Sequence, residues 1–153
     1  MSNFRISPDH SNGNTMSFVI VDDSEDVLQI WKRVFQQEGK CVCFLTTDPW
    51  VALEEIDNQK PQILITDLLM PGLSGFQLAK KAKEILPSLQ VFLTTGSPNQ
   101  LKEFDLFEDI LEVLQKPYMN IENVQHFVHD LATQQPLDRS LCVQHGKFNM
   151  WNL

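Results

Sequence analysis

Five short apolar runs, rich in β-branched and aromatic residues, alternate along the chain with segments whose apolar residues recur at helical spacing. Short runs of this kind between turn residues are typical of buried strands. The five predicted strands cover residues 18–21, 41–45, 63–67, 91–95 and 110–114. The helical segments lie between Ser24 and Gly39, from Pro49 to about Asn58, from about Gly75 to Leu86, from Ser97 to about Phe104, and after Asn120.

Strands that alternate with helices favour a parallel sheet covered by helices on both faces. The ends of the helical segments agree with this reading, because Ser24, Asp48 and Asn120 have side-chain oxygens suited to helix N-caps. Gly39 suits the end of the first helix, where a left-handed residue is common. We therefore predict an α/β fold, a (βα)5 doubly wound sheet of five parallel strands.

Length and composition indicate one globular domain. The chain has 153 residues, of which 42% are hydrophobic and 21% charged, and this length can bury a sizeable core. No apolar run approaches the ~20 residues that a membrane span needs, and the first residues do not resemble a secretory signal. We expect a cytoplasmic protein without a membrane segment, in which Cys41 and Cys43 are reduced core residues on one face of a strand.

The pattern divides the chain into three segments. Residues 1–15 are polar without periodicity, so we expect a flexible N-terminal arm. Residues 16–133 hold the predicted strands and helices. Residues 134–153 are too few for a second domain, yet they include several large apolar side chains. This C-terminal tail either packs on its own domain, docks a partner or a second copy in a dimer, or is disordered.

Acidic charge is concentrated in the middle segment. The whole chain has a net charge of −8, and residues 16–133 contain nine Lys and Arg against eighteen Asp and Glu. An acidic body without a basic patch argues against direct binding of nucleic acid. It suits a partner with a basic surface, or a site that gathers a cation.

Polar side chains follow four of the five predicted strands at the point where each strand ends. Asp22 and Asp23 follow the first strand, Asp67 ends the third, Thr95 ends the fourth and Lys116 comes just after the fifth. Ligands of open α/β sheets bind at the carboxyl ends of the strands. In the strand order 2-1-3-4-5 the first and third strands are neighbours, so the three carboxylates meet in one crevice.

Three close carboxylates raise one another's pKa unless a cation neutralises them. Mg²⁺ fits such a site, because it uses a few carboxylates and keeps several waters. A carboxylate beside Mg²⁺ and an ammonium group can act as a nucleophile and form an aspartyl phosphate. Lys116 and the metal then stabilise charge on the phosphoryl oxygens, and the Thr95 hydroxyl can donate to the phosphate. Each residue alone also fits a helix cap, a turn or a surface position; their joint occurrence favours the phosphoryl site.

These residues resemble the motifs of the receiver domain of response regulators in two-component signalling, over residues 16 to about 133. The resemblance rests on Val21-Asp22-Asp23-Ser24, on Asp67 with Met70-Pro71-Gly72, on Thr95-Gly96 and on Lys116-Pro117. It implies a flavodoxin-like, CheY-like sheet with strand order 2-1-3-4-5.

The resemblance also implies a role for each site residue. Asp67 is the implied phospho-acceptor. Asp22, Asp23 and Asp67, with the backbone carbonyl of Leu69, are the implied Mg²⁺ ligands. Thr95 is the implied switch hydroxyl and Lys116 the phosphate-contacting lysine, with a cis bond to Pro117.

The implied function is that of a stand-alone receiver. It accepts a phosphoryl group from a phosphohistidine on a histidine kinase or a histidine phosphotransfer protein, and it passes the signal to a downstream protein by direct contact. It catalyses its own phosphorylation and slow autodephosphorylation, and it is not a metabolic enzyme.

Two departures from the family pattern leave alternatives open. Val113 stands where the family often has Tyr or Phe, so a receiver-like binding module that works without phosphorylation is one alternative. Leu69, two residues after Asp67, predicts slow hydrolysis because an apolar side chain orients water poorly.

Two other functions are disfavoured. A Mg²⁺-dependent phosphatase usually has a second Asp where this chain has Leu69. A flavin-binding relative would need a hydroxyl- and Gly-rich loop after the first strand.

Overall fold

The computed structural model describes residues 3–8, 15–103, 110–116, 120–136 and 142. The strands of the described chain are β1 (Asn3–Ile6), β2 (Ser17–Val21), β3 (Val42–Thr46), β4 (Ile63–Asp67), β5 (Gln90–Thr95) and β6 (Ile110–Gln115). The helices are α1 (Glu25–Glu38), α2 (Pro49–Gln59), α3 (Gly75–Ile85), the short 3₁₀ helix η1 (Pro98–Glu103) and α4 (Ile121–Thr133).

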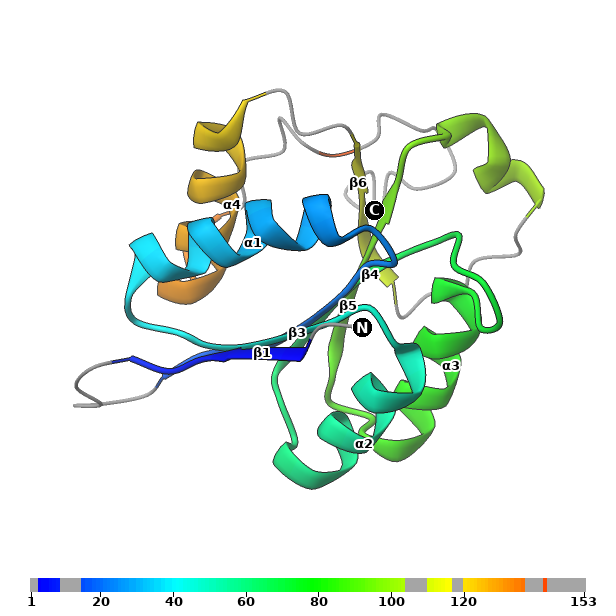
Figure 1. The fold of residues 1–153 in the computed structure, drawn as a ribbon, viewed down its shortest axis with the longest axis horizontal. Coiled ribbons are helices and arrows are strands. Elements are labelled where there is room, and N and C mark those ends of the chain that lie inside the picture. The colour runs from blue at the N-terminus through cyan, green and yellow to red at the C-terminus, as the bar shows by residue number, and fades with distance from the viewer. Residues whose placement is uncertain (1–2, 9–14, 104–109, 117–119, 137–141, 143–153) are drawn as a thin grey trace.

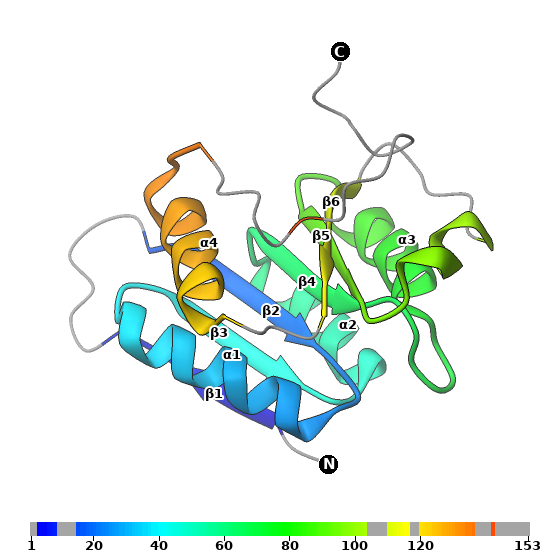
Figure 2. The ribbon, with the colours of Figure 1, turned by 90° about the horizontal axis from the view of Figure 1, so that it is seen from above.

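The strands form one twisted sheet with the order β1-β3-β2-β4-β5-β6, in which β2 to β6 are parallel. Helices α1 and α4 cover one face, and α2 and α3 cover the other (Figures 1 and 2). The five predicted strands are β2 to β6, and their order is the predicted 2-1-3-4-5. The α/β fold is thereby confirmed.

The sheet has a sixth strand where the sequence predicted only a flexible arm, so that prediction is wrong for residues 3–6. Strand β1 pairs antiparallel with β3, from Asn3 opposite Thr46 to Ile6 opposite Cys43. Side chains fix it from both faces: Lys32 lies over the Phe4 ring, and Arg5 pairs with Glu55. The first three residues of β1 are exposed and Ile6 is half-buried, so the strand has little of the apolar pattern from which buried strands are predicted.

Two apolar clusters, one on each face of the sheet, make the core. The first lies between the sheet and helices α1 and α4, and it includes Cys41 and Cys43, as predicted. The second lies between the sheet and helices α2 and α3. Side chains on successive strand residues point to opposite faces, so each strand contributes alternately to the two clusters.

Side-chain caps stabilise the first turns of helices α1 to α4. The side chains of Ser24, Asp48 and Asn120 accept backbone N–H groups of the helices that they precede, as predicted. Ser74 and Gln77 form a capping box at the start of α3. Within the described residues, none of these helices has the length and apolar character that crossing a bilayer requires.

Of the C-terminal tail, the structure describes residues 134–136, directly after α4, and Cys142. Cys142 forms an isolated antiparallel β-bridge with Leu114 of β6 and packs against the core cluster on the α1 and α4 face. At this residue, the tail contacts its own domain. The remaining predictions for the tail, and the cis bond predicted at Pro117, lie outside the described residues.

Candidate functional site

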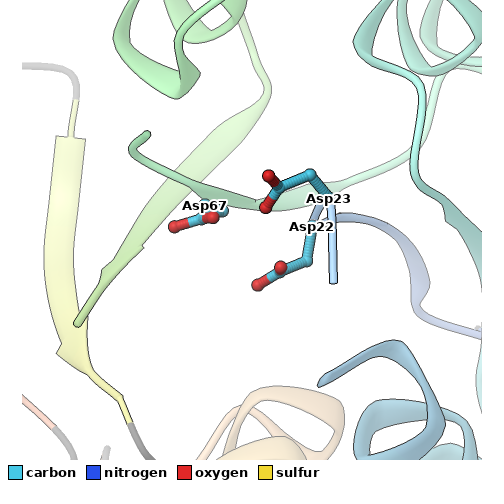
Figure 3. A group of neighbouring side chains, drawn as sticks. All are labelled: Asp22, Asp23 and Asp67. Carbon is cyan, nitrogen blue, oxygen red and sulfur yellow. The ribbon is translucent and has the colours of Figure 1, made fainter. Parts of the chain in front are cut away.

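Three aspartates converge at the carboxyl ends of the adjacent strands β2 and β4 (Figure 3). One carboxylate oxygen from each of Asp22, Asp23 and Asp67 lies within 4.8 Å of the others. Val21 pairs with Thr66 across the two strands, so Asp22, just after β2, lies beside Asp67, the last residue of β4. Asp22 and Asp67 are 1% and 6% exposed, whereas Asp23 is exposed to solvent.

Lys116 reaches the same crevice from the end of β6. Its Nζ lies 3.0 Å from Oδ2 of Asp22 and 3.3 Å from Oδ1 of Asp67. The Lys116 backbone N–H donates to the Thr95 carbonyl over 2.8 Å, which extends the β5–β6 pairing to the base of the lysine. The sequence prediction that these four residues meet is therefore confirmed in position.

Burial and mutual repulsion perturb the two inner carboxyl groups. Burial raises the pKa of Asp67 to about 6, with a further upward effect from Asp22, although Lys116 acts in the opposite direction. Burial also raises the pKa of Asp22, despite hydrogen bonds from the Ser24 N–H and Lys116. Burial lowers the pKa of Lys116, but the two carboxylates outweigh it and the pKa is raised. The site thus holds more negative charge than one lysine compensates.

Thr95 is buried at the end of β5, between the strands that carry Asp67 and Lys116. Its Oγ1 accepts the Ser97 backbone N–H over 3.0 Å. In the described chain the hydroxyl makes no hydrogen bond to Asp67, so Thr95 lies at the predicted edge of the sheet without joining the four charged residues.

Leu69 and Val113 occupy contrasting surroundings. The Leu69 side chain is 42% exposed on the loop that follows Asp67. Val113 is 1% exposed and packs in the core cluster on the α2 and α3 face. Val113 is therefore a packing residue here, while Leu69 faces solvent next to the acidic crevice.

Gly75 supports Asp67 in a way that the sequence analysis missed. As the first residue of α3, it donates its N–H to the Leu68 carbonyl over 2.8 Å. A Cβ at this position would lie 2.0 Å from the carbonyl oxygen of Asp67, so only glycine allows the helix to approach the strand end this closely. Glycine is a poor helix former, and its place at the start of a predicted helix was the available signal.

The donor set fits a hard divalent cation. Carboxylate oxygens are preferred Mg²⁺ ligands, and three of them lie together here. The pKa values of Asp22 and Asp67 are raised, as expected for carboxylates that lie close together in a partly dehydrated site. A bound cation would reduce the repulsion between them.

The family model of the response regulator receiver domain matches residues 18–128. Because the match covers most of the chain, this protein belongs to the response regulator receiver domain family. The family as a whole is phosphorylated on an aspartate, binds Mg²⁺ at an acidic cluster, and interacts with histidine kinases or phosphotransfer proteins.

Curated relatives agree with this assignment. A putative two-component response regulator of Arabidopsis thaliana is 32% identical over 92 residues, which are 58% of this chain and 16% of that protein. The sporulation initiation phosphotransferase F of Bacillus subtilis is 25% identical over 95 residues, which are 62% of this chain and 73% of that protein. The chain spans far less than two thirds of the first of these relatives.

Solved structures show the same fold. A signal receiver domain of an HD domain-containing protein from Pseudomonas fluorescens superposes with a TM-score of 0.67 at 19% identity, covering 79% of this chain and 96% of that one. The chemotaxis response regulator CheY4 of Vibrio cholerae gives a TM-score of 0.60 at 21% identity, covering 71% of this chain and 92% of that one.

Proposed function

We propose that this protein is a receiver in which Asp67 accepts a phosphoryl group from a phosphohistidine. The observation that carries the proposal is the meeting of Asp22, Asp23 and Asp67 within 4.8 Å, with Lys116 paired to two of them. The donor is a histidine kinase or a histidine phosphotransfer protein, in keeping with the family.

The chemistry assigned to Asp67 is an in-line displacement at phosphorus. A carboxylate oxygen of Asp67 forms a bond to phosphorus while the bond from phosphorus to the histidine nitrogen breaks, and that nitrogen keeps the electron pair. With a pKa of about 6, the carboxyl group is about nine tenths ionised at pH 7. Asp67 is therefore available as a nucleophile without a separate base.

The neighbouring residues supply charge and orientation. Asp22, Asp23 and Asp67, with the Leu69 backbone carbonyl, are the residues that would hold Mg²⁺, which when bound neutralises charge on the phosphoryl oxygens. The Nζ of Lys116 lies 3.3 Å from Oδ1 of Asp67. From there it can pair with the negatively charged oxygens of the phosphoryl group. The Thr95 hydroxyl, whose oxygen accepts the Ser97 N–H, can donate its own hydrogen to a phosphoryl oxygen.

The consequences of phosphorylation extend to a downstream protein partner, through direct contact at a surface that changes with the state of Asp67. The protein acts in the cytoplasm and is not a metabolic enzyme, because its chemistry is limited to its own phosphorylation and slow autodephosphorylation. Exposed, apolar Leu69 keeps that hydrolysis slow.

A receiver-like binding module that acts without phosphorylation is the second candidate. The observation that favours it is the burial of Val113 in the core, because a packed valine cannot make the large rotation of an aromatic switch. The two candidates differ in whether Asp67 is ever modified.

Incubation with a small phosphodonor and Mg²⁺, followed by intact-mass measurement, separates these candidates. The proposal predicts a gain of one phosphoryl group in the natural protein, and no gain in Asp67→Asn or when EDTA removes the metal. Asp57→Asn, on the exposed surface of α2, is the matched control and is expected to gain the group normally. Absence of any gain in the natural protein would favour the binding module.

A further inference from the structure

Thr94 has a buried hydroxyl that its fold does not satisfy. The residue is 2% exposed, and within the described part of the chain its Oγ1 has no hydrogen-bond partner. Burying a hydroxyl without a hydrogen-bond partner destabilises the folded state, whereas a valine of the same shape at that position would avoid this cost. A threonine at this position is therefore expected to form its hydrogen bond in another state of the protein.

The alternation of side chains places Thr94 on the same face of the sheet as the charged site. On β5, Phe92 belongs to the core cluster under α1 and α4, and Leu93 belongs to the cluster on the opposite face. Thr94 therefore follows Phe92, two residues earlier, onto the α1 and α4 face. By the same alternation, the side chain of Thr95, the predicted switch residue, leaves the strand on the opposite face.

Asp67 follows the same rule on β4, and Asp22 and Lys116 continue it one residue beyond the ends of β2 and β6. Asp22 comes two residues after Ile20, Asp67 two after Ile65, and Lys116 two after Leu114. These three apolar residues all belong to the cluster under α1 and α4. The two ion pairs of Lys116, to Asp22 and Asp67, agree with a shared face.

The strand register makes Thr94 a direct neighbour of Asp67. Asp67 pairs with Thr94 across β4 and β5, and Thr94 pairs with Leu114 across β5 and β6. Directly opposite side chains on one face of neighbouring strands lie close enough to interact. Lys116 starts two residues beyond Leu114 and reaches back to Asp67, so Thr94 lies between the base of the lysine and its carboxylate partner.

We propose that the Thr94 hydroxyl is a positioning group for the nucleophile: it donates a hydrogen bond to one oxygen of Asp67 when the site is loaded for phosphoryl transfer. In the structure described here Lys116 holds Oδ1 of Asp67, and the Thr94 hydroxyl makes no such bond. When Lys116 turns toward the incoming phosphoryl oxygens, Asp67 loses that donor. Thr94 then replaces it, because a hydroxyl rotates freely to suit its acceptor.

The benefit to the reaction is orientation. A carboxylate held through one oxygen presents the other oxygen to phosphorus in a fixed direction, and a third group that orients a nucleophile is a recurring arrangement in covalent catalysis. The hydrogen bond forms and breaks no covalent bond. The transfer step is still the displacement in which Asp67 bonds to phosphorus as the bond to the histidine nitrogen breaks. The inference rests on the proposed function, since it concerns the same aspartate.

The test compares Thr94→Val, Thr94→Ser and Thr66→Val with the natural protein. The measured quantities are the rate of phosphoryl gain from a small phosphodonor at saturating Mg²⁺, the Mg²⁺ concentration for half-maximal rate, and the thermal midpoint in EDTA. Thr66 is the matched control, because it is a buried threonine beside Asp67 whose hydroxyl bonds the Asp67 carbonyl on the backbone.

Thr94→Val is expected to slow the gain of the phosphoryl group roughly tenfold, because one charge-assisted hydrogen bond to Asp67 is lost. It should leave the half-maximal Mg²⁺ concentration within about twofold and raise the thermal midpoint, because the unsatisfied hydroxyl is gone. Thr94→Ser should stay within about threefold of the natural rate. Thr66→Val should lower the midpoint and keep the rate within about twofold.

An unchanged rate in Thr94→Val, or a loss in Thr66→Val as large as in Thr94→Val, would overturn the role of Thr94 and leave the phospho-acceptor role of Asp67 intact. A natural protein that never gains the group would overturn the proposed function, and the role of Thr94 with it.

Discussion

Neutralising Asp67 should stabilise the metal-free protein. The perturbation is Asp67→Asn, which keeps the size of the side chain and removes its charge. In the folded protein, burial and the nearby Asp22 carboxylate raise the pKa of Asp67 from 3.8 to about 6. The folded state therefore binds the Asp67 proton more tightly than the unfolded state does.

The sign and size of the effect follow from that pKa. A group whose pKa is raised by folding contributes stability that is complete below pH 3.8 and is lost as the pH rises through about 6. A difference of about two pH units corresponds to roughly 3 kcal/mol at pH 7. The Asn variant cannot ionise, so its free energy of unfolding at pH 7 should exceed that of the natural protein by up to this amount. For a domain of this length, the midpoint should rise by about 6 to 12 °C.

Thermal unfolding in EDTA, measured by circular dichroism from pH 4 to pH 8, tests this expectation. The gap between the two proteins should be widest at pH 7 and above, and should close toward pH 4. Added Mg²⁺ should raise the midpoint of the natural protein more than that of the variant, because the ion binds the folded state through Asp67. Asp57→Asn, at an exposed surface ion pair with Lys60, should stay within about 0.5 kcal/mol of the natural protein at every pH.

Two results would refute the reasoning. One is an Asn variant no more stable than the natural protein at pH 7 in EDTA, because Asp67 would then carry no electrostatic strain. The other is a gap that stays constant from pH 7 to pH 4, because a stability difference that does not titrate has a cause other than the Asp67 charge.

Three further substitutions or truncations test the surroundings of Asp67. Gly75→Ala should cost more than 2 kcal/mol in urea unfolding and slow phosphoryl gain, because its Cβ would lie 2.0 Å from the Asp67 carbonyl oxygen; a loss below 0.5 kcal/mol would contradict the close approach. Leu69→Asn should shorten the phosphoryl half-life several-fold by orienting water, measured by intact mass over time, and an unchanged half-life would count against that role. Removal of residues 1–8 should cost about 1–2 kcal/mol, since it exposes the edge of β3 and removes the ion pair of Arg5 with Glu55, while phosphoryl gain should continue; a protein that no longer folds would show that β1 is essential.

The parts of the fold that the sequence could predict are those whose side chains carry the structural information. Strands β2 to β6 are buried on both faces, so their apolar runs are visible without knowledge of the partner strands. The polar residues at the strand ends are visible for the same reason, and it is their joint occurrence at four strand ends that distinguishes them from helix caps, turns and surface positions. Asp67 and Lys116 were found together because parallel strands bring their carboxyl ends to one edge.

The remaining features depend on contacts between distant segments. Strand β1 is largely exposed, and its pairing with β3 depends on a backbone partner some forty residues away, so its sequence has no apolar pattern to find. The role of Gly75 depends on how closely α3 approaches β4, a distance that no local pattern contains. Thr94 looks like one more β-branched residue in a strand, and what distinguishes it is a buried hydroxyl that has no hydrogen-bond partner among the described residues.

The most direct test of the phospho-acceptor is to locate the phosphoryl group along the chain. After incubation with a small phosphodonor and Mg²⁺, borohydride reduction converts an aspartyl phosphate to homoserine, and tandem mass spectrometry of the peptides identifies the modified position. The proposed function predicts the modification at Asp67 and at no other aspartate of the cluster. Modification at Asp22 or Asp23, or no modification of the protein at all, would contradict it.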